Sequence, residues 1–195
     1  MQIQYFSDLH LEYLDDIPNI KAYKVLCLLG DMGYPFSNIY TKFLLHLQEN
    51  NNIEKIFLIT GNHEYYSSDY SIHDINEKIK DIILKNKLDK ITFLNNSSEL
   101  YNGYLFVGST LWSFINNNNY LTNDFSNIYE INIDKYNEMY KKSVEYITST
   151  INNNIDKNII LLTHFLPDVS FIPTAKLEAH VLLIYLMYLL YQQLN

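Results

Sequence analysis

The stretch from Leu58 to Glu64 constrains the fold more than any other part of the chain, because an apolar run stops there and functional side chains follow. Residues 56–59 are typical of a buried strand, and Gly61 after them permits a backbone conformation that a residue with a Cβ would resist. The turn would then present Asn62, His63 and Glu64 at the carboxyl end of the strand. Taken alone, these residues also fit a polar loop with a surface histidine.

Three other apolar runs end in side chains that can bind a metal. Residues 2–7 lead to Asp8 and His10, residues 24–29 lead to Gly30 and Asp31, and residues 158–162 lead to Thr163 and His164. In an extended segment residues i and i+2 point to the same side, so Asp8 and His10 could reach one ion. A turn-capping aspartate with an incidental histidine is the alternative for this pair.

The remaining pattern predicts helices and further strands. Apolar residues at helical spacing predict helices within residues 35–52, 71–87 and 134–153, with Asp69 or Ser71 as the cap of the second. Residues 90–94 form a short strand, and 99–107 form a hairpin around Asn102-Gly103, which makes the sheets mixed. The polar segment up to residue 133 is long for a connection, and Trp112 at its start is expected to be a packing anchor rather than a substrate platform.

Composition limits the class of protein. With 195 residues and 48% apolar content the chain fits one domain with a sizeable core. A formal charge of −8 and the lack of a Lys or Arg cluster argue against an extended nucleic-acid or anionic-membrane surface. Cys27 is the only cysteine, and the first residues read as a strand rather than a signal peptide, which favours a cytoplasmic, intracellular location.

The four strand ends are expected to converge. Sites in sheets wound with helices form outside the carboxyl ends of the strands, so residues far apart in the sequence can meet there. Mixed imidazole, carboxylate and amide ligands suit two divalent ions of the Mn, Fe, Zn or Mg class. A carboxylate can bridge two such ions about 3.5–4 Å apart, the spacing at which they activate a water and hold a phosphoryl group.

In this order, the four motifs resemble those of the calcineurin-like metallophosphoesterase superfamily. Asp8-x-His10, Gly30-Asp31, Gly61-Asn62-His63-Glu64 and Thr163-His164 carry the resemblance, and Gly108 to Trp112 resembles a strand-end segment of small bacterial and viral members. The resemblance implies an α/β fold with a two-sheet β-sandwich core of mixed sheets, flanked by helices, and a dinuclear metal centre at one rim.

The resemblance also implies a role for each site residue. Asp8 and His10 would bind the first metal, Asp31 would bridge both metals, and Asn62 with His164 would bind the second. His63 would contact the phosphate or protonate the leaving oxygen, with Glu64 orienting it, so that the catalytic residues are His63 and Glu64.

The C-terminal part departs from the family pattern. Such enzymes finish with a further strand and a Gly-His-x-His motif, which this sequence lacks, and His180 is the only later histidine. Residues 181–191 form an apolar run that is too short for a bilayer-spanning helix, which needs about 20 residues. We therefore expect a metallophosphoesterase-like domain over 1–173, incomplete at its C-terminus, and an atypical apolar tail over 174–195 that could self-associate through Val181–Tyr191.

These observations predict an enzyme, a calcineurin-like phosphoesterase that hydrolyses a phosphate mono- or diester through metal-activated water. Its partner would be a phosphate-ester substrate, with no membrane span and no extended nucleic-acid surface. The alternative is a catalytically impaired protein that keeps the fold and acts as a protein-binding module, because the final histidine pair is missing.

Overall fold

Two four-stranded sheets form the centre of the molecule. The computed structural model describes residues 1–116 and 122–167, and the backbone of residues 181–185. The first sheet contains β1 (Ile3–Phe6), β2 (Val25–Leu29), β3 (Lys55–Ile59) and β4 (Ile91–Phe93), all parallel and in that order. The second sheet has the order β5 (Ser97–Tyr101), β6 (Tyr104–Ser109), β7 (Asn158–Thr163) and β8 (Val181–Tyr185).

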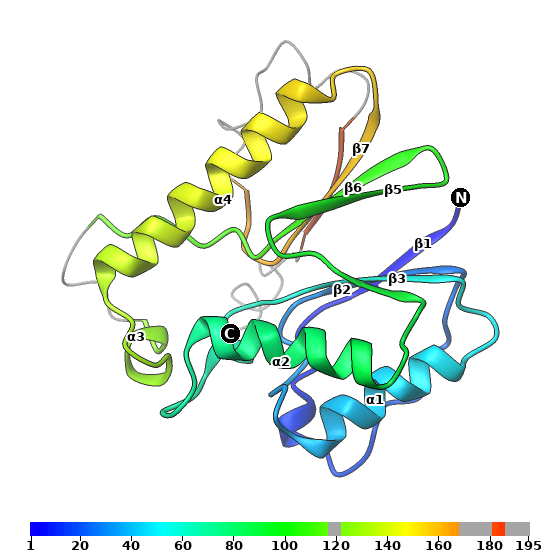
Figure 1. Ribbon diagram of the computed structural model, residues 1–195, viewed down its shortest axis with the longest axis horizontal. Coiled ribbons are helices and arrows are strands. Elements are labelled where there is room, and N and C mark those ends of the chain that lie inside the picture. The colour runs from blue at the N-terminus through cyan, green and yellow to red at the C-terminus, as the bar shows by residue number, and fades with distance from the viewer. Residues whose placement is uncertain (117–121, 168–180, 186–195) are drawn as a thin grey trace, which may run out of the picture.

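Helices cover the outer faces of both sheets (Figure 1). Helices α1 (Asn38–Glu49) and α2 (Ile72–Lys85) lie against the first sheet, and α4 (Ile133–Asn153) lies against the second. Shorter helices follow the functional turns or the polar segment: η1 (Leu11–Tyr13), η2 (His63–Tyr65) and α3 (Asp124–Asn127). The α/β fold with a two-sheet core and mixed strand directions is therefore confirmed.

Strand alternation explains the layers. Val25, Cys27 and Leu29 of β2 face the other sheet, whereas the alternate residues Leu26 and Leu28 face the helices. Between the sheets the rings of Phe57 and Phe106 stack with their centroids 3.9 Å apart. On the outer face of the second sheet Ile147 of α4 packs against the buried residues of β6 and β7. Both faces of β2 are thus buried, as its uninterrupted apolar sequence predicts.

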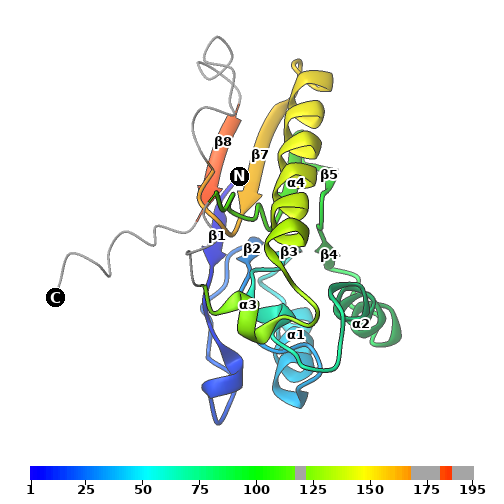
Figure 2. The same cartoon turned by 90° about the vertical axis from the view of Figure 1, so that its left-hand side faces the viewer.

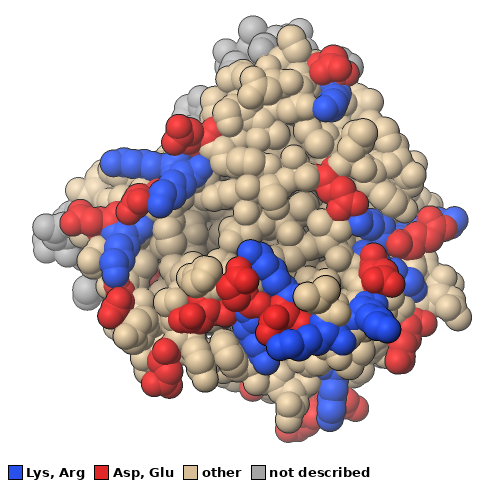
Figure 3. Space-filling model, viewed as in Figure 1, with Lys and Arg blue, Asp and Glu red and all other residues tan. Residues whose placement is uncertain are grey.

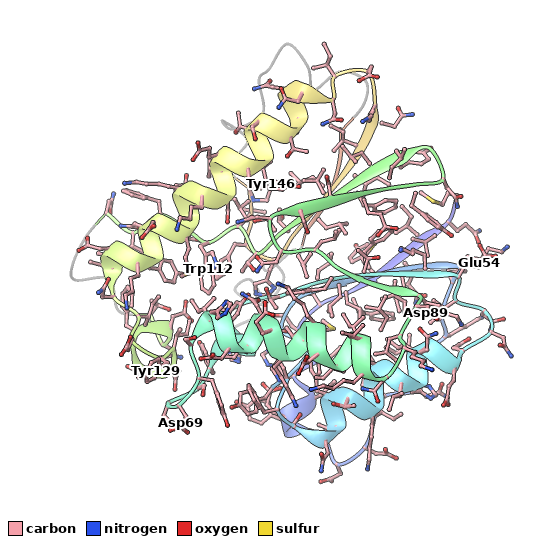
Figure 4. All side chains as sticks on the ribbon, in the orientation of Figure 1. Glu54, Asp69, Asp89, Trp112, Tyr129 and Tyr146 are labelled. Atoms are coloured by element: carbon pink, nitrogen blue, oxygen red, sulfur yellow. The ribbon has the colours of Figure 1, made fainter. Side chains whose placement is uncertain are left out.

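The structure confirms several local predictions: the hairpin turn, a cap of α2 and the packing of Trp112. Asn102 and Gly103 both have positive φ, of 50° and 79°, which a tight two-residue hairpin turn requires. Ser71 caps α2 in a capping box with Asp74, so Ser71 rather than Asp69 is the cap. Trp112 is 5% exposed among aromatic rings, including those of Tyr65 and Tyr136, and is labelled in Figure 4. The packing role predicted for Trp112 is confirmed.

The apolar run at residues 181–191, assigned above to an atypical tail, begins with a strand of the second sheet. Val181–Tyr185 form β8, which pairs in parallel with β7 at the edge of the second sheet (Figure 2). In this register Tyr185 lies opposite Thr163, so the carboxyl end of β8 lies at the same rim as that of β7. His180 and residues 186–191 lie outside the described part of the chain.

Charged side chains are interspersed on the face shown in Figure 3. Lys side chains alternate with Asp and Glu in the region of α2, where Lys80 pairs with Glu77 and Lys85 pairs with Asp81. Among the helices that the structure describes, none has the length and apolarity needed to cross a membrane.

Candidate metal centre

The turns after β1 and β2 lie side by side and bring together the first three predicted ligands. Backbone N–H groups of Asp8 and His10 donate to the carbonyls of Gly30 and Asp31, at 3.1 and 3.0 Å. Asp8, His10 and Asp31 all have φ near +50°, a left-handed conformation that is unfavourable for residues other than glycine. Ligand atoms of these three side chains lie within 4.8 Å of one another. The unusual backbone thus coincides with the convergence of three potential ligands.

Asp31 stands at the centre of the cluster. It is 3% exposed, and its Oδ1 accepts a hydrogen bond from the backbone N–H of His63 at 2.9 Å. Its Oδ2 lies 3.9 Å from Nε2 of His10 and 3.6 Å from Nε2 of His164. One buried carboxylate oxygen therefore lies between imidazoles that come from the two different sheets, as the bridging role predicted for Asp31 requires.

His164 presents a lone pair to oxygen atoms. Its Nδ1 lies 2.9 Å from the carbonyl oxygen of Leu29, so Nδ1 carries a proton and donates it. In the neutral ring Nε2 is then an acceptor, and it faces Oδ1 of Asn62 at 3.2 Å as well as the Asp31 carboxylate. Three acceptor atoms thus face one another, an arrangement that a cation between them stabilises. The donor set fits a divalent metal with nitrogen and oxygen ligands.

The side-chain amide of Asn62 is turned so that its oxygen faces this cluster. Its Nδ2 donates to Oδ1 of Asp124 at 2.8 Å and to the hydroxyl of Tyr66 at 3.2 Å. Burial, and next the hydrogen bond to Asp124, raise the pKa of the Tyr66 hydroxyl, which therefore stays protonated. Asp124 lies in the polar segment before α4 and follows no apolar run, so the pattern of strand ends did not point to it.

His63 lies beside the cluster with its ring half-buried. The ring stacks on Tyr66 with centroids 4.2 Å apart and meets the edge of the His10 ring at 4.5 Å. Burial alone would lower the pKa of His63, but the hydrogen bond to Glu12 and the charge of Asp31 raise it overall. His63 can thus hold a proton next to the predicted metals, as a general acid must.

Glu12 is a second residue that the sequence analysis missed. Its Oε1 lies 3.1 Å from Nδ1 of His10 and 3.8 Å from Nδ1 of His63. Burial raises the pKa of Glu12, but the hydrogen bonds to His63 and His10 outweigh burial and lower it to about 2. A carboxylate on Nδ1 of a histidine leaves Nε2 free for a metal, so the i+2 spacing from His10 was a usable signal. Ligand atoms of His10, Glu12 and His63 also lie within 4.8 Å of one another.

Glu64 holds two turns together. Its fully buried carboxylate accepts hydrogen bonds from the backbone N–H groups of Asp31, Met32 and Gly61, at 2.9, 2.7 and 2.8 Å. Burial and the nearby charge of Asp31 raise the pKa of Glu64, against the opposing effect of the three N–H groups. These contacts join the turn after β2 to the turn after β3. An effect of Glu64 on His63 would run through the backbone of that turn, and this orienting role stays a prediction.

Gly61 is required for a different reason from the one that the sequence suggested. Its φ is not among the positive values found at Gly30, Gly33 and Gly103. Instead, a Cβ at Gly61 would lie 2.1 Å from Oδ1 of Asp31 and 2.7 Å from Cε1 of His164. The close approach of two predicted ligands, and not an unusual backbone conformation, excludes a side chain there.

A polar pocket adjoins the cluster. It has a volume of about 470 Å³ and shares Tyr66 with the surroundings of His63 and Asn62. Its other walls come from the loop after η2 and from the end of α3, which are joined by a hydrogen bond from Ser67 N–H to the Asn127 carbonyl at 2.7 Å.

The fold and the convergent strand ends are those of metal-dependent phosphoesterases. Residues 1–180 match the family model of the calcineurin-like phosphoesterases, and the chain belongs to this family. It is 33% identical over 194 residues to the uncharacterized protein L509 of Acanthamoeba polyphaga mimivirus, covering 85% of this chain and 68% of L509. Among solved structures, the phosphopantetheinyl hydrolase PptH of Mycobacterium tuberculosis has a similar fold, with a TM-score of 0.58 and 13% identity over 84% of this chain and 68% of that one.

Proposed function

We propose that this chain is a metal-dependent phosphoesterase that hydrolyses a phosphate mono- or diester. Asp8, His10 and Asp31 would hold one divalent ion, and Asp31, Asn62 and His164 would hold the other. The observation that carries the proposal is the position of Asp31 Oδ2, which lies 3.9 Å from His10 Nε2 and 3.6 Å from His164 Nε2. Membership in the phosphoesterase family supports the reaction class.

The side chains around the proposed metal centre would have different roles in the reaction. Two bound ions of the Mn, Fe, Zn or Mg class would supply an activated water at neutral pH and stabilise the charge that develops on the phosphoryl group. His63 would give a proton to the leaving oxygen. The carboxylate of Glu12, near Nδ1 of His63, would orient the His63 ring. Glu64 would keep Asp31 and the turn before His63 in place, through hydrogen bonds to backbone N–H groups of both turns.

Hydrolysis of an aryl phosphate and of an aryl phosphodiester, with and without metal, tests this function. The protein is stripped with a chelator and then assayed with Mn²⁺, Zn²⁺ or Mg²⁺ added singly. We expect turnover to vanish on stripping and to return with at least one of the ions, because the bound ions supply the activation of the attacking water. Turnover that persists at full rate in the stripped protein would exclude the proposed reaction.

The second candidate is a protein that keeps the fold but binds a partner instead of a substrate. It is favoured by the sequence after β8, where Leu186, Met187 and Tyr188 follow the strand that ends at the rim of the site. The metal content of the protein separates the two candidates, because a binding module has no need of the two ions.

A cytoplasmic location is part of the proposal. It rests on Cys27, the only cysteine in the sequence, which is fully buried within β2. As the only cysteine, Cys27 has no disulfide partner within the chain. Burial also raises the pKa of its thiol, which makes it a poor nucleophile.

A further inference from the structure

Asp124 is a buried carboxylate in the polar segment that separates β6 from α4, and the reaction proposed above does not use it. It is the first residue of α3 and is 2% exposed. Its Oδ1 accepts hydrogen bonds from Nδ2 of Asn62 and from the hydroxyl of Tyr66, both at 2.8 Å. Its Oδ2 accepts from the hydroxyl of Tyr136 in α4 at 3.1 Å. Both carboxylate oxygens are therefore occupied, by donors from the two ends of η2 and from α4.

The contact with Asn62 determines which end of the amide faces the metal cluster. An asparagine side chain offers an oxygen acceptor at one end and two N–H donors at the other, and only the oxygen can bind a cation. With Nδ2 held by Asp124, Oδ1 of Asn62 points to His164 Nε2 at 3.2 Å. An amide turned the other way would direct N–H groups toward the position of a positive ion.

Other contacts hold Asp124 in the position from which it accepts the hydrogen bond of the Asn62 amide. The bridges of Tyr66 and Ser67 to Ile128 tie the segment that contains α3 to the loop after η2. Asp69 and Tyr129, labelled in Figure 4, mark these two segments at the same end of the molecule, below the start of α4. Tyr136 attaches the carboxylate to α4, which packs on the second sheet. Asp124 thus connects a predicted ligand on the first sheet to a helix on the second.

We propose that Asp124 is a positioning residue that selects the metal-binding orientation of the Asn62 amide. This inference rests on the proposed metal centre and adds a requirement from outside the family motifs: the polar segment before α4 must fold for the ion beside Asn62 and His164 to bind tightly. The ion beside Asp8 and His10 does not depend on Asp124, because its predicted ligands come from the turns after β1 and β2.

Calorimetric titration of Mn²⁺ into metal-free protein tests this inference without an activity assay. For Asp124→Ala we expect one of the two Mn²⁺ affinities to fall by about 10–100-fold, the usual cost of removing a residue that orients a metal ligand, while the other affinity stays. Asp124→Asn keeps an acceptor oxygen for the Asn62 amide, so it should retain most of the lost affinity. Asp74→Ala is the matched control, since Asp74 is exposed and serves only the cap of α2.

The outcomes are distinguishable. A wild-type protein that binds no Mn²⁺ refutes the proposed function, whereas a wild type with two ions and an Asp124→Ala variant with both affinities unchanged refutes only the role of Asp124. Equal weakening of the binding of both ions would also overturn that role.

A second variant, Tyr66→Phe, decides the question if circular dichroism shows that Asp124→Ala is unfolded. It removes the second partner of Asn62 Nδ2. We expect selective weakening of one Mn²⁺ affinity by about 3–10-fold, the size of one hydrogen bond. No selective weakening in Tyr66→Phe would then contradict the proposal.

Discussion

At the scale of single residues, a specific partner on Nδ1 fixes the ring of each of two predicted ligands, His10 and His164. Nδ1 of His164 is held by a backbone carbonyl, and Nδ1 of His10 is held by Glu12. In both rings this leaves Nε2 directed toward Asp31. Histidines that bind metals are usually fixed in this way, by a partner on the opposite ring nitrogen. His63 differs from these two histidines. Its ring stacks on Tyr66, and its ligand atom groups with those of His10 and Glu12 rather than with Asp31.

Replacement of His63 by alanine should separate chemistry from metal binding. We expect kcat to fall by about 10²–10⁴, the usual effect of removing a general acid, while the metal content is unchanged. The loss should shrink for aryl esters with good leaving groups, which need little protonation. His73→Ala, at an exposed histidine of α2, serves as the control. Loss of bound metal in His63→Ala would instead make His63 a ligand.

At the scale of elements, the turns after the strands carry the site, and glycines let those turns approach closely. A Cβ at Gly30 would lie 2.3 Å from the backbone nitrogen of Gly61. The φ of Gly30 is +90°, which also favours glycine. The hydroxyls of Thr60 and Thr110, 2.9 Å apart, join the end of β3 to the end of β6 at the same rim. The two sheets are thus connected at the place where the predicted ligands meet.

Gly61→Ala should damage the site more than the fold. Because a methyl group there would meet Asp31 and His164, those side chains must move, and a displacement of about 1 Å can lower activity about 10²-fold. Gly103→Ala is the control: its φ of +79° makes alanine unfavourable by about 1–2 kcal/mol, but no atom lies within 4 Å. The control should lower thermal stability and leave Mn²⁺ affinity intact. Equal Mn²⁺ affinity in the two variants would contradict this account of Gly61.

Much of this architecture could be predicted from sequence, because the signals are local. Apolar runs followed by glycine or polar ligands predicted the strands and their ends, and the Asn102-Gly103 pair predicted the hairpin. Asp124 could not be found in the same way, since its contacts are with residues distant in the sequence. Glu12 has a local signal in its i+2 spacing from His10, but the two residues lie in an irregular turn rather than at the end of an apolar run. The reason for Gly61 was also wrong, because the close approach of Asp31 and His164 is a tertiary contact with no local signal.

At the scale of the whole molecule, two layers of helices enclose the paired sheets, and β8 lies at one edge of the second sheet. In the strand order of the second sheet β8 pairs with β7 on one side, and among the described residues no strand pairs with its other side. An edge of this kind, followed by further apolar residues, can pair with another chain. The prediction of self-association through residues 181–191 therefore stands untested.

Light scattering over a range of concentrations tests self-association. We expect an average mass that rises above the 23.1 kDa of one chain as the concentration increases. Leu189→Lys places a charge in the apolar run and should lower this mass, whereas Leu84→Lys, at a helix position that is 76% exposed, should not. A mass of one chain at every concentration would show that the run is satisfied within the monomer.

Anomalous diffraction from a crystal of the protein grown with Mn²⁺ tests the central claim most directly. We predict two anomalous peaks about 3.5–4 Å apart, with Asp31 between them. One peak should be bound by Asp8 and His10, and the other by Asn62 and His164. A single peak held by His10, Glu12 and His63, or no peak near Asp31, would contradict the account.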